Sequence, residues 1–327
     1  MSNRPTLAVS LGDPAGIGPE IVCAAAARDD VRDACRITVF GDRGVLAAVG
    51  FDAGALESGS LPSAIERVVE VTSLAVSSGL PKPGKEAGEG AYRYLDAAAR
   101  ATMAGEYDAL VTAPLNKYWL DQAGYHYDGH TGYLSELAGK PATMMLAGRK
   151  LRVVLVTTHV SIADVPGLLT TSLIEQRART AARFLEETAG ISAPRLAVAA
   201  LNPHAGEGGL FGDEEQRIIS PAVQSLAGSG IDVAGPLPAD TLFAAAAGGD
   251  YVAVVCMYHD QALIPLKLLE FGRSVNISMG LPFLRTSPDH GTAYDLAGTG
   301  KASADSMAEA ILAAATMARR VKTRRKS

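Results

Sequence analysis

The residues YVAVVCMYH, at positions 251–259, form one of three short apolar runs in this chain that end in a histidine. The other two are LRVVLVTTH at 151–159 and RLAVAALNPH at 195–204. Continuous runs rich in valine, leucine and alanine are typical of strands that are covered on both faces of a parallel sheet. We therefore expect these three runs to be buried parallel strands of an α/β fold.

The histidines that end these runs, His159, His204 and His259, are expected at one edge of the sheet, because ligands in open parallel sheets bind beyond the carboxyl ends of the strands. Three imidazoles that leave coordination positions open suit a catalytic divalent metal, whereas a structural zinc site closes four ligands. A polar substrate pocket without a metal would use histidines in the same way, and the residues by themselves leave both interpretations open. Loss of activity on chelation and in His204→Ala would favour the metal.

Strand-like and helix-like segments alternate along the rest of the chain, which predicts a largely parallel sheet. A stretch rich in proline and glycine at 79–90 predicts an exposed loop or hinge. Beyond the three runs, strands are expected at 6–11, 37–41 and 109–113, and helices from 19 onward and over 91–104, 173–188, 214–226 and 303–320.

The composition is that of a globular protein with a sizeable core, and it indicates neither a nucleic-acid nor a membrane partner. Of 327 residues, 48% are hydrophobic and 20% charged, and a length of this size suggests about two domains. The net charge of −5 attracts no nucleic acid, and the basic tail at 319–326 is expected to be a solvated end. No apolar stretch reaches the ~18 residues of a membrane span, and no signal peptide is recognisable. Three cysteines without CxxC spacing fit a reducing compartment, so we expect a cytoplasmic protein.

A glycine-rich turn, GDPAGIGPE at 12–20, follows the first expected strand. Its glycines allow tight turns, and Pro19 suits the first position of a helix. Such a turn could hold a phosphate at the helix N-terminus, or it could be a close-packed turn without a ligand. It lacks the complete dinucleotide pattern, and the sequence leaves both interpretations open.

Several cationic and polar side chains stand among apolar residues, where an isolated charge is costly unless it is paired. Lys267, Asn276 and Arg285 lie in one such region. A phosphate or a carboxylate would pair these cations, with arginine the natural bidentate partner. His130 and Thr131 can also hydrogen-bond phosphate oxygens. We therefore expect an anionic substrate group.

Three further residues are candidates for proton transfer or for orienting a ligand. Lys117 could transfer a proton if its pKa were lowered, and an ordinary surface lysine is the alternative. Asp240 and Asp260 could orient a metal-bound imidazole or a water. Either could instead be a helix N-cap.

Motifs that span nearly the whole chain resemble the 4-hydroxythreonine-4-phosphate dehydrogenase family of pyridoxal phosphate biosynthesis. The motif at 201–209 and the long block at 271–302 are the most specific of them. In order they are GDPAGIGPE at 12–20, GHT at 129–131, TTH at 157–159, LNPHAGEGG at 201–209, GPLPADT at 235–241, MYHDQ at 257–261 and FGRSVNISMGLPFLRTSPDHGTAYDLAGTGKA at 271–302.

The resemblance implies an isocitrate/isopropylmalate dehydrogenase-like fold, with two α/β domains and an active site in the cleft of a homodimer. By this analogy, residues 1–130 plus 275–327 form the cofactor-side domain. Residues 131–274 form the domain for metal, substrate and dimerisation. The family's zinc, magnesium or cobalt ion is held by three histidines, one of them from the partner subunit, and they match His159, His204 and His259.

The resemblance also assigns substrate and cofactor contacts. Family substrate contacts match His130, Thr131, Lys267, Asn276 and Arg285. The segment 290–302 resembles the loop that grips the adenosine side of NAD or NADP in the decarboxylating dehydrogenases, so contacts are expected from His290, Gly291, Thr292, Ala293 and Asp295. Lys117, Asp240 and Asp260 are the catalytic candidates.

The implied activity is oxidation of 4-phosphooxy-threonine to a 3-keto acid, which decarboxylates to 3-amino-2-oxopropyl phosphate. Related sub-groups act on threonate or erythronate 4-phosphate or on aromatic dihydrodiols. A phosphate acyltransferase-like enzyme and a metal-dependent hydrolase are alternatives from other classes. Two residues depart from the family pattern: Gly132 stands where glutamate commonly follows GHT, and Ala262 stands where glycine usually follows MYHDQ.

Overall fold

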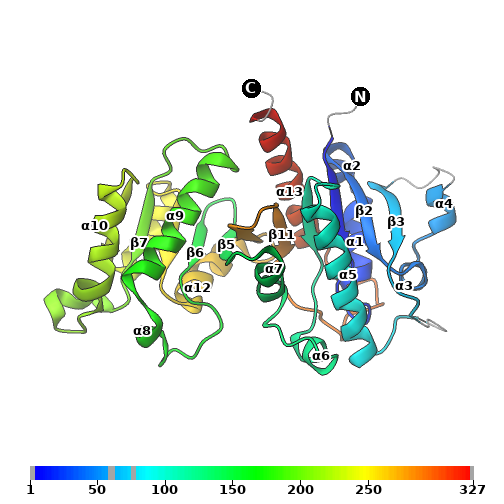
Figure 1. The fold of residues 1–327 in the computed structure, drawn as a ribbon, viewed down its shortest axis with the longest axis horizontal. Coiled ribbons are helices and arrows are strands. Elements are labelled where there is room, and N and C mark those ends of the chain that lie inside the picture. The colour runs from blue at the N-terminus through cyan, green and yellow to red at the C-terminus, as the bar shows by residue number, and fades with distance from the viewer. Residues whose placement is uncertain (1–3, 58–62, 75–78, 325–327) are drawn as a thin grey trace. The chain divides into compact units, whose positions relative to one another are not determined.

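The computed structural model describes residues 4–57, 63–74 and 79–324. Figure 1 shows the order of the helices and strands along the chain. No helix in the described part of the chain is both long enough and apolar enough to cross a membrane.

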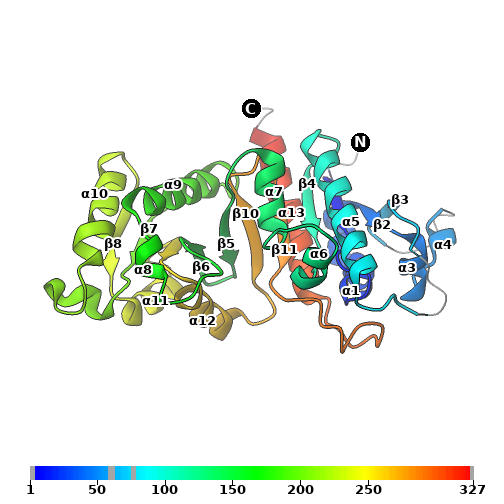
Figure 2. The ribbon, with the colours of Figure 1, turned by 60° about the horizontal axis from the view of Figure 1, so that its bottom comes forward.

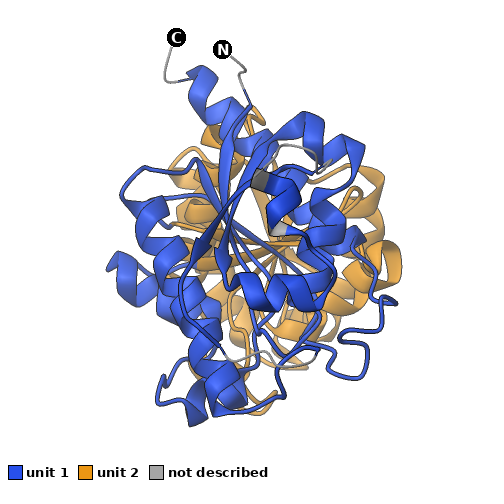
Figure 3. Ribbon diagram, turned by 90° about the vertical axis from the view of Figure 1, so that its right-hand side faces the viewer, with its two compact units in different colours: residues 1–142, 281–327 blue, residues 143–280 orange. Residues whose placement is uncertain are grey.

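The chain divides into two compact units (Figure 3). The first contains residues 1–142 and 281–327, and the second contains residues 143–280. These boundaries differ from those expected at 130/131 and 274/275, because α7 (His130–Ala138) belongs to the first unit and β10 (Val275–Met279) to the second.

The first unit is a parallel sheet with helices packed on its strands. Its strand order is β3-β2-β1-β4-β11, and the pairings within it are parallel. Helix α5 packs through Leu95 and Ala98 on Ala8 of β1 and Leu110 of β4. The strands are β1 (Thr6–Ser10), β2 (Arg36–Gly41), β3 (Ile65–Glu70), β4 (Ala109–Thr112) and β11 (Arg285–Pro288). The helices are α1 (Gly18–Ala26), α2 (Asp29–Ala34), α3 (Arg43–Ala48), α4 (Ala53–Glu57), α5 (Lys85–Met103), α6 (Lys117–Gln122), α7 and α13 (Asp305–Arg324).

The loop predicted at 79–90 is wrong over its second half, because α5 begins at Lys85. Lys85, Glu86 and Ala87 are good helix formers that extend the predicted helix toward the N-terminus. Two of the glycines that suggested a loop, Gly88 and Gly90, are packing residues within this helix. A Cβ atom at Gly88 would lie 2.1 Å from the carbonyl oxygen of Trp119 in α6.

The second unit is a mixed sheet with the order β10-β5-β6-β9-β7-β8. Strands β6, β9, β7 and β8 are parallel, whereas β5 runs antiparallel to both of its neighbours. The remaining strands are β5 (Thr143–Ala147), β6 (Arg152–Leu155), β7 (Leu196–Ala199), β8 (Val233–Leu237) and β9 (Ala253–Cys256). The helices are α8 (Val165–Leu168), α9 (Thr171–Glu187), α10 (Ser220–Gly228), α11 (Ala239–Gly248) and α12 (His259–Glu270), with a π-helical turn at Glu215–Ile219.

The three histidine-terminated runs form β6, β7 and β9, with β9 between the other two and all three parallel. Val153, Val198 and Val254 in these strands are completely buried. The prediction of buried parallel strands is therefore confirmed, and all three strands end at the same edge of the sheet.

Candidate active site

Two of the three predicted metal-binding histidines lie together at the edge of the second unit. His159 follows β6 and His259 begins α12 directly after β9, and their ring centroids are 5.8 Å apart. Both rings line a pocket of about 250 Å³. The other lining residues are Thr158, Val160, Ile162, Val165, Tyr258 and Asp260.

Asp260 orients the second of these rings. Its Oδ1 atom lies 2.7 Å from Nδ1 of His259. If Nδ1 donates its proton to this carboxylate, Nε2 keeps the lone pair that a metal ion requires. The two imidazoles and the carboxylate therefore fit part of a divalent metal site. In the part of the chain that the structure describes, no group of three or more histidine, cysteine, aspartate or glutamate side chains is arranged to hold a metal ion.

His204 accordingly does not join His159 and His259 within one chain. It lies in the turn Pro203–Gly209, where five consecutive residues from His204 to Gly208 have positive φ. This backbone carries the ring to the surface of the unit, with its centroid 6.3 Å from that of the half-exposed Phe211. The expectation that strand ends alone bring three rings together fails here, because the backbone turns left-handed at His204 itself.

A buried glutamate that sequence reasoning missed holds the start of this turn. Glu215 is 3% exposed, and its Oε1 atom accepts hydrogen bonds from the backbone nitrogens of Leu201 (2.8 Å) and Asn202 (2.7 Å). The Nδ2 atom of Asn202 also donates to Oε2 of Glu215, at 3.0 Å. The glycines of GEGG signal unusual backbone, but nothing in the sequence connects them to Glu215.

Cationic and polar groups of the first unit gather around the start of β11. Arg285, only 2% exposed, donates from Nη2 to Oγ1 of Thr112, at 2.7 Å. Burial lowers the pKa of the Arg285 guanidinium, because the charged form loses solvation there.

His130 and Lys117 contribute to the same electrostatic environment. The pKa of His130 lies well below 6.5, chiefly because of burial and then because of the charge of Arg285, with a smaller effect of Lys117. Its Nε2 atom is buried and has no hydrogen-bond partner in the described residues. A neutral imidazole beside two cations can bind an anion without adding another buried charge.

Gly132 allows a close approach at the start of α7. A Cβ atom there would lie 2.3 Å from Oδ1 of Asp128, so a larger residue requires this carboxylate to move. The other departure, Ala262, lies in α12 and is completely buried in the core of the second unit.

The remaining predicted residues lie on four different elements, α7, α12, β10 and α11. Thr131 lies in the first turn of α7, and Lys267 lies in α12, on the helix that also carries His259. Asn276 lies in β10, and its Oδ1 atom is buried without a partner in the described residues. Asp240 is exposed in the first turn of α11, where Pro238 holds the N-cap position, so the N-cap interpretation is wrong for Asp240.

The glycine-rich turn after β1 is a close-packed turn. Its backbone N–H groups at Asp13, Gly16 and Ile17 donate to carbonyl oxygens of the protein, and that of Ala15 donates to the Asp13 carboxylate. Because these donors already have partners, the structure does not support the alternative that they hold a phosphate.

The segment 290–302 has no regular secondary structure. Its predicted cofactor residues differ in exposure: His290, Gly291 and Asp295 are exposed, whereas Thr292 is 8% exposed and Ala293 has a φ of 40°. The segment therefore combines exposed residues, which a ligand can reach, with the buried side chain of Thr292.

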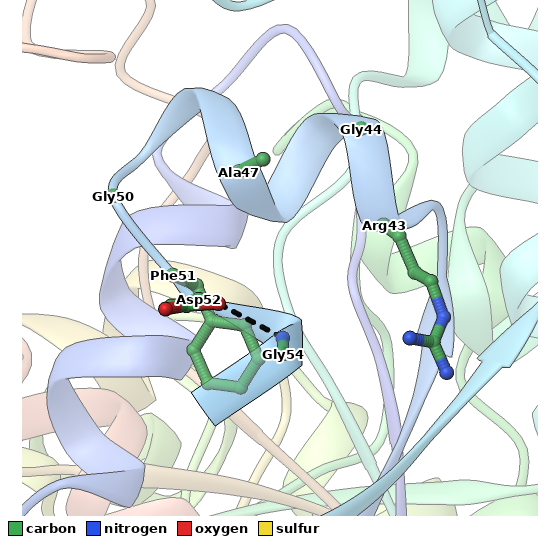
Figure 4. Close-up of a pocket in the computed structure, with 7 residues that line it drawn as sticks. All are labelled: Arg43, Gly44, Ala47, Gly50, Phe51, Asp52 and Gly54. Atoms are coloured by element: carbon green, nitrogen blue, oxygen red, sulfur yellow. Dashed lines mark hydrogen bonds between the residues drawn. The ribbon is translucent and has the colours of Figure 1, made fainter. Parts of the chain in front are cut away.

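A second pocket, of about 620 Å³, lies against α3 and α4 of the first unit. Figure 4 shows Arg43 at the opposite end of this pocket from Phe51 and Asp52, whose side chains lie close together. The Asp52 carboxylate accepts hydrogen bonds from the backbone at Gly54 and Ala55. None of the residues predicted to be functional lines this pocket.

Comparison with known proteins shows which family this chain resembles. Residues 33–314 match the family model described as pyridoxal phosphate biosynthetic protein PdxA. A 4-hydroxythreonine-4-phosphate dehydrogenase from Geobacter metallireducens is 49% identical, over 97% of each chain. A D-threonate 4-phosphate dehydrogenase from Cupriavidus necator is 42% identical, over 97% of this chain and 98% of that protein.

A solved structure with a similar fold is a 4-hydroxythreonine-4-phosphate dehydrogenase from Klebsiella pneumoniae. Its TM-score is 0.83 at 41% identity, covering 97% of this chain and 100% of that one. The fold and the family resemblance are thus confirmed, and the chain belongs to the family of the pyridoxal phosphate biosynthetic protein PdxA.

Proposed function

We propose that this protein is a metal- and NAD(P)-dependent dehydrogenase that oxidises 4-phosphooxy-threonine in pyridoxal phosphate biosynthesis, in the cytoplasm. The 3-keto acid formed would decarboxylate to 3-amino-2-oxopropyl phosphate. The observation that carries the proposal is the pair His159 and His259 at one pocket, with Asp260 bonded to the second ring. Relatives named as 4-hydroxythreonine-4-phosphate dehydrogenases support the substrate.

His159 and His259 would hold the divalent cation together with His204 of a second copy of the chain. Exposed apolar residues accompany each part: Ile162, which lines the pocket, is 71% exposed, and Leu210, which follows the turn that carries His204, is 74% exposed. Association of two copies would bury these residues, which favours a homodimer. A divalent cation held there would lower the pKa of the substrate hydroxyl.

Residues of the first unit would bind the substrate's anionic group. Arg285 would pair with an oxygen of the phosphate or carboxylate, and His130 and Thr131 would add hydrogen bonds. From the second unit, Lys267 and Asn276 are proposed as further contacts. Together these residues would orient the C–H bond for hydride transfer to NAD⁺ or NADP⁺.

Lys117 is the proposed proton relay, with Asp240 as the alternative. Lys117 begins α6, and its Cε atom would lie 3.2 Å from a Cβ atom at Gly129, next to His130. A Lys117→Met variant should bind substrate and lose turnover. Full turnover in that variant would remove Lys117 from this role.

The substrate is tested by comparing specificity constants for threonine-, threonate- and erythronate-type 4-phosphates with Mg²⁺, Zn²⁺ or Co²⁺ and either cofactor. Formation of reduced cofactor with 4-phosphooxy-threonine as the best substrate supports the proposal. A preference for threonate 4-phosphate would favour the activity named for the Cupriavidus relative. Product formation without cofactor reduction would indicate a hydrolase or an acyltransferase.

The shared metal site is tested by mixing inactive variants. His204→Ala and His259→Ala should each be inactive alone, but a mixed dimer contains one site with all three histidines. Random association should restore about a quarter of wild-type activity. No recovery in mixtures shown to form mixed dimers would contradict the shared site.

A further inference from the structure

The turn after β1 and the segment after β11 lie side by side in the first unit, although they are far apart in sequence (Figure 2). The first is the glycine-rich turn at 12–20, and the second is the proposed cofactor segment at 290–302. Hydrogen bonds join them at the beginning, near the middle and at the end of the cofactor segment.

The first contact is a backbone bond at the start of α1. The N–H of Ile17 donates to the carbonyl oxygen of Thr292, at 2.9 Å. A Cβ atom at Gly16 would lie 2.9 Å from the same oxygen. Glycine at this position therefore lets the two backbones approach, and the N-terminus of α1 binds the protein's own carbonyl group.

The second contact joins Asp13 and Tyr294. The tyrosine hydroxyl donates to Oδ2 of Asp13 at 2.5 Å, while Oδ1 accepts from the N–H of Ala15 at 2.9 Å. Asp13 is completely buried. Because one oxygen fixes the carboxylate to its own turn, the other holds Tyr294 in a defined place.

The third contact is made by the Glu20 carboxylate, in the first turn of α1. Its Oε2 atom accepts from the N–H of Gly298 at 2.8 Å, and Oε1 accepts from the N–H of Ala302 at 3.3 Å. Gly298 and Gly300 both have positive φ and are exposed. A glycine-rich, exposed stretch loses much conformational freedom when it is ordered, and Glu20 holds it at both ends.

We infer that Asp13 and Glu20 are positioning residues that keep segment 290–302 in the shape that binds the adenosine side of NAD(P), an inference that rests on the proposed function. Because the bonds that order this segment come from the chain itself, cofactor binding avoids most of the ordering cost. The glycine-rich turn thereby acts on the cofactor without touching it.

The test uses Glu20→Gln and Glu20→Ala, with Tyr294→Phe as an isosteric variant that lacks the hydroxyl bonded to Asp13. The matched control is Glu86→Gln, because Glu86 is exposed and also lies in the first turn of a helix, α5. The readouts are the dissociation constant for each cofactor without substrate, KM and kcat for both substrates, and amide hydrogen exchange of residues 298–302.

Glu20→Ala should raise the dissociation constant and KM for the cofactor about 10-fold, as expected for loss of charge-assisted hydrogen bonds. The kcat at saturating cofactor and the KM for the phosphorylated substrate should stay near wild type. Amides 298–302 should exchange faster, and Glu86→Gln should match wild type in all readouts. Glu20→Gln and Tyr294→Phe should give smaller increases.

Unchanged cofactor binding in both Glu20→Ala and Tyr294→Phe would overturn the inference, even if thermal stability fell. Absence of cofactor reduction by the wild-type protein would refute the proposed function, while the dissociation constants would still decide the inference. A wild-type protein that binds neither cofactor would overturn both.

Discussion

Removing the Glu215 side chain should destabilise the second unit and weaken metal binding. The carboxylate accepts three hydrogen bonds from Leu201 and Asn202 at 2.7–3.0 Å in a buried environment. Glu215→Ala leaves two backbone N–H groups without this acceptor, and each unsatisfied buried donor costs about 1–3 kcal/mol. Since water can replace part of the loss, we expect the free energy of unfolding to fall by about 3 kcal/mol.

Glu215→Gln provides the graded comparison. Its amide oxygen can still accept both backbone hydrogen bonds, and only the charge and the bond to the Asn202 side chain are lost. We expect a loss of about 1 kcal/mol for this variant. Because Asn202 immediately precedes the turn that carries His204, affinity for Co²⁺ or Zn²⁺ should fall about 10-fold or more in Glu215→Ala.

Urea denaturation of the metal-free protein measures the stability, and titration with Co²⁺ followed by visible absorbance measures the affinity. Glu187→Ala is the control, because Glu187 is exposed near the end of α9, and it should change stability by less than about 0.5 kcal/mol. If Glu215→Ala unfolded at the wild-type urea concentration, the argument from buried hydrogen bonds would be refuted. If only the Co²⁺ affinity were unchanged, His204 would not depend on this anchor.

Three further predictions concern single residues. Arg285→Lys should raise KM for the phosphorylated substrate about 10- to 100-fold, because a lysine cannot reproduce the planar, bidentate pairing of a guanidinium with an anion. The control is Arg273→Lys at an exposed position, which should leave steady-state kinetics unchanged. Asp260→Asn should weaken metal binding about 10- to 100-fold in calorimetric titrations. The amide can accept from a protonated Nδ1 of His259 or donate to an unprotonated one, so it no longer selects the tautomer that leaves Nε2 free for the metal. Equal affinity would show that the carboxylate does not orient the ring. The folded-state pKa of His130 is below 6.5. Below about pH 6.5 the unfolded chain therefore binds a proton that the folded chain does not, and the free energy of unfolding should decrease as the pH is lowered. Unfolding curves of His130→Asn should lose this part of the pH dependence, and an unchanged dependence would contradict the assigned shift.

The parallel strands were predictable because burial on both faces produces a continuous apolar run. Val153, Val198 and Val254 all lie in such runs. Strand β11 was not predicted, because its sequence RTSP is polar and its burial depends on contacts with β4 and α13. A polar strand of this kind cannot be distinguished from a loop by local pattern.

Part of the candidate site could likewise be located from strand ends. His159 and His259 follow neighbouring strands closely, so strand direction was enough to bring them to one pocket. His204 instead begins a left-handed stretch that contains several glycines, and Glu215 holds the residues just before it. The partners of the glycine-rich turn could not be predicted, because Tyr294 and Gly298 meet it only through the fold.

The wide sequence separation of the paired strands has a consequence for how the enzyme matures. Val153 pairs with Val254, and Leu110 pairs with Arg285. A nascent chain on the ribosome therefore carries His159 and Thr112 long before their neighbours have been synthesised. The pocket lined by His159 and His259 and the surroundings of Arg285 can therefore form only near the end of translation, so a prematurely terminated product would lack both.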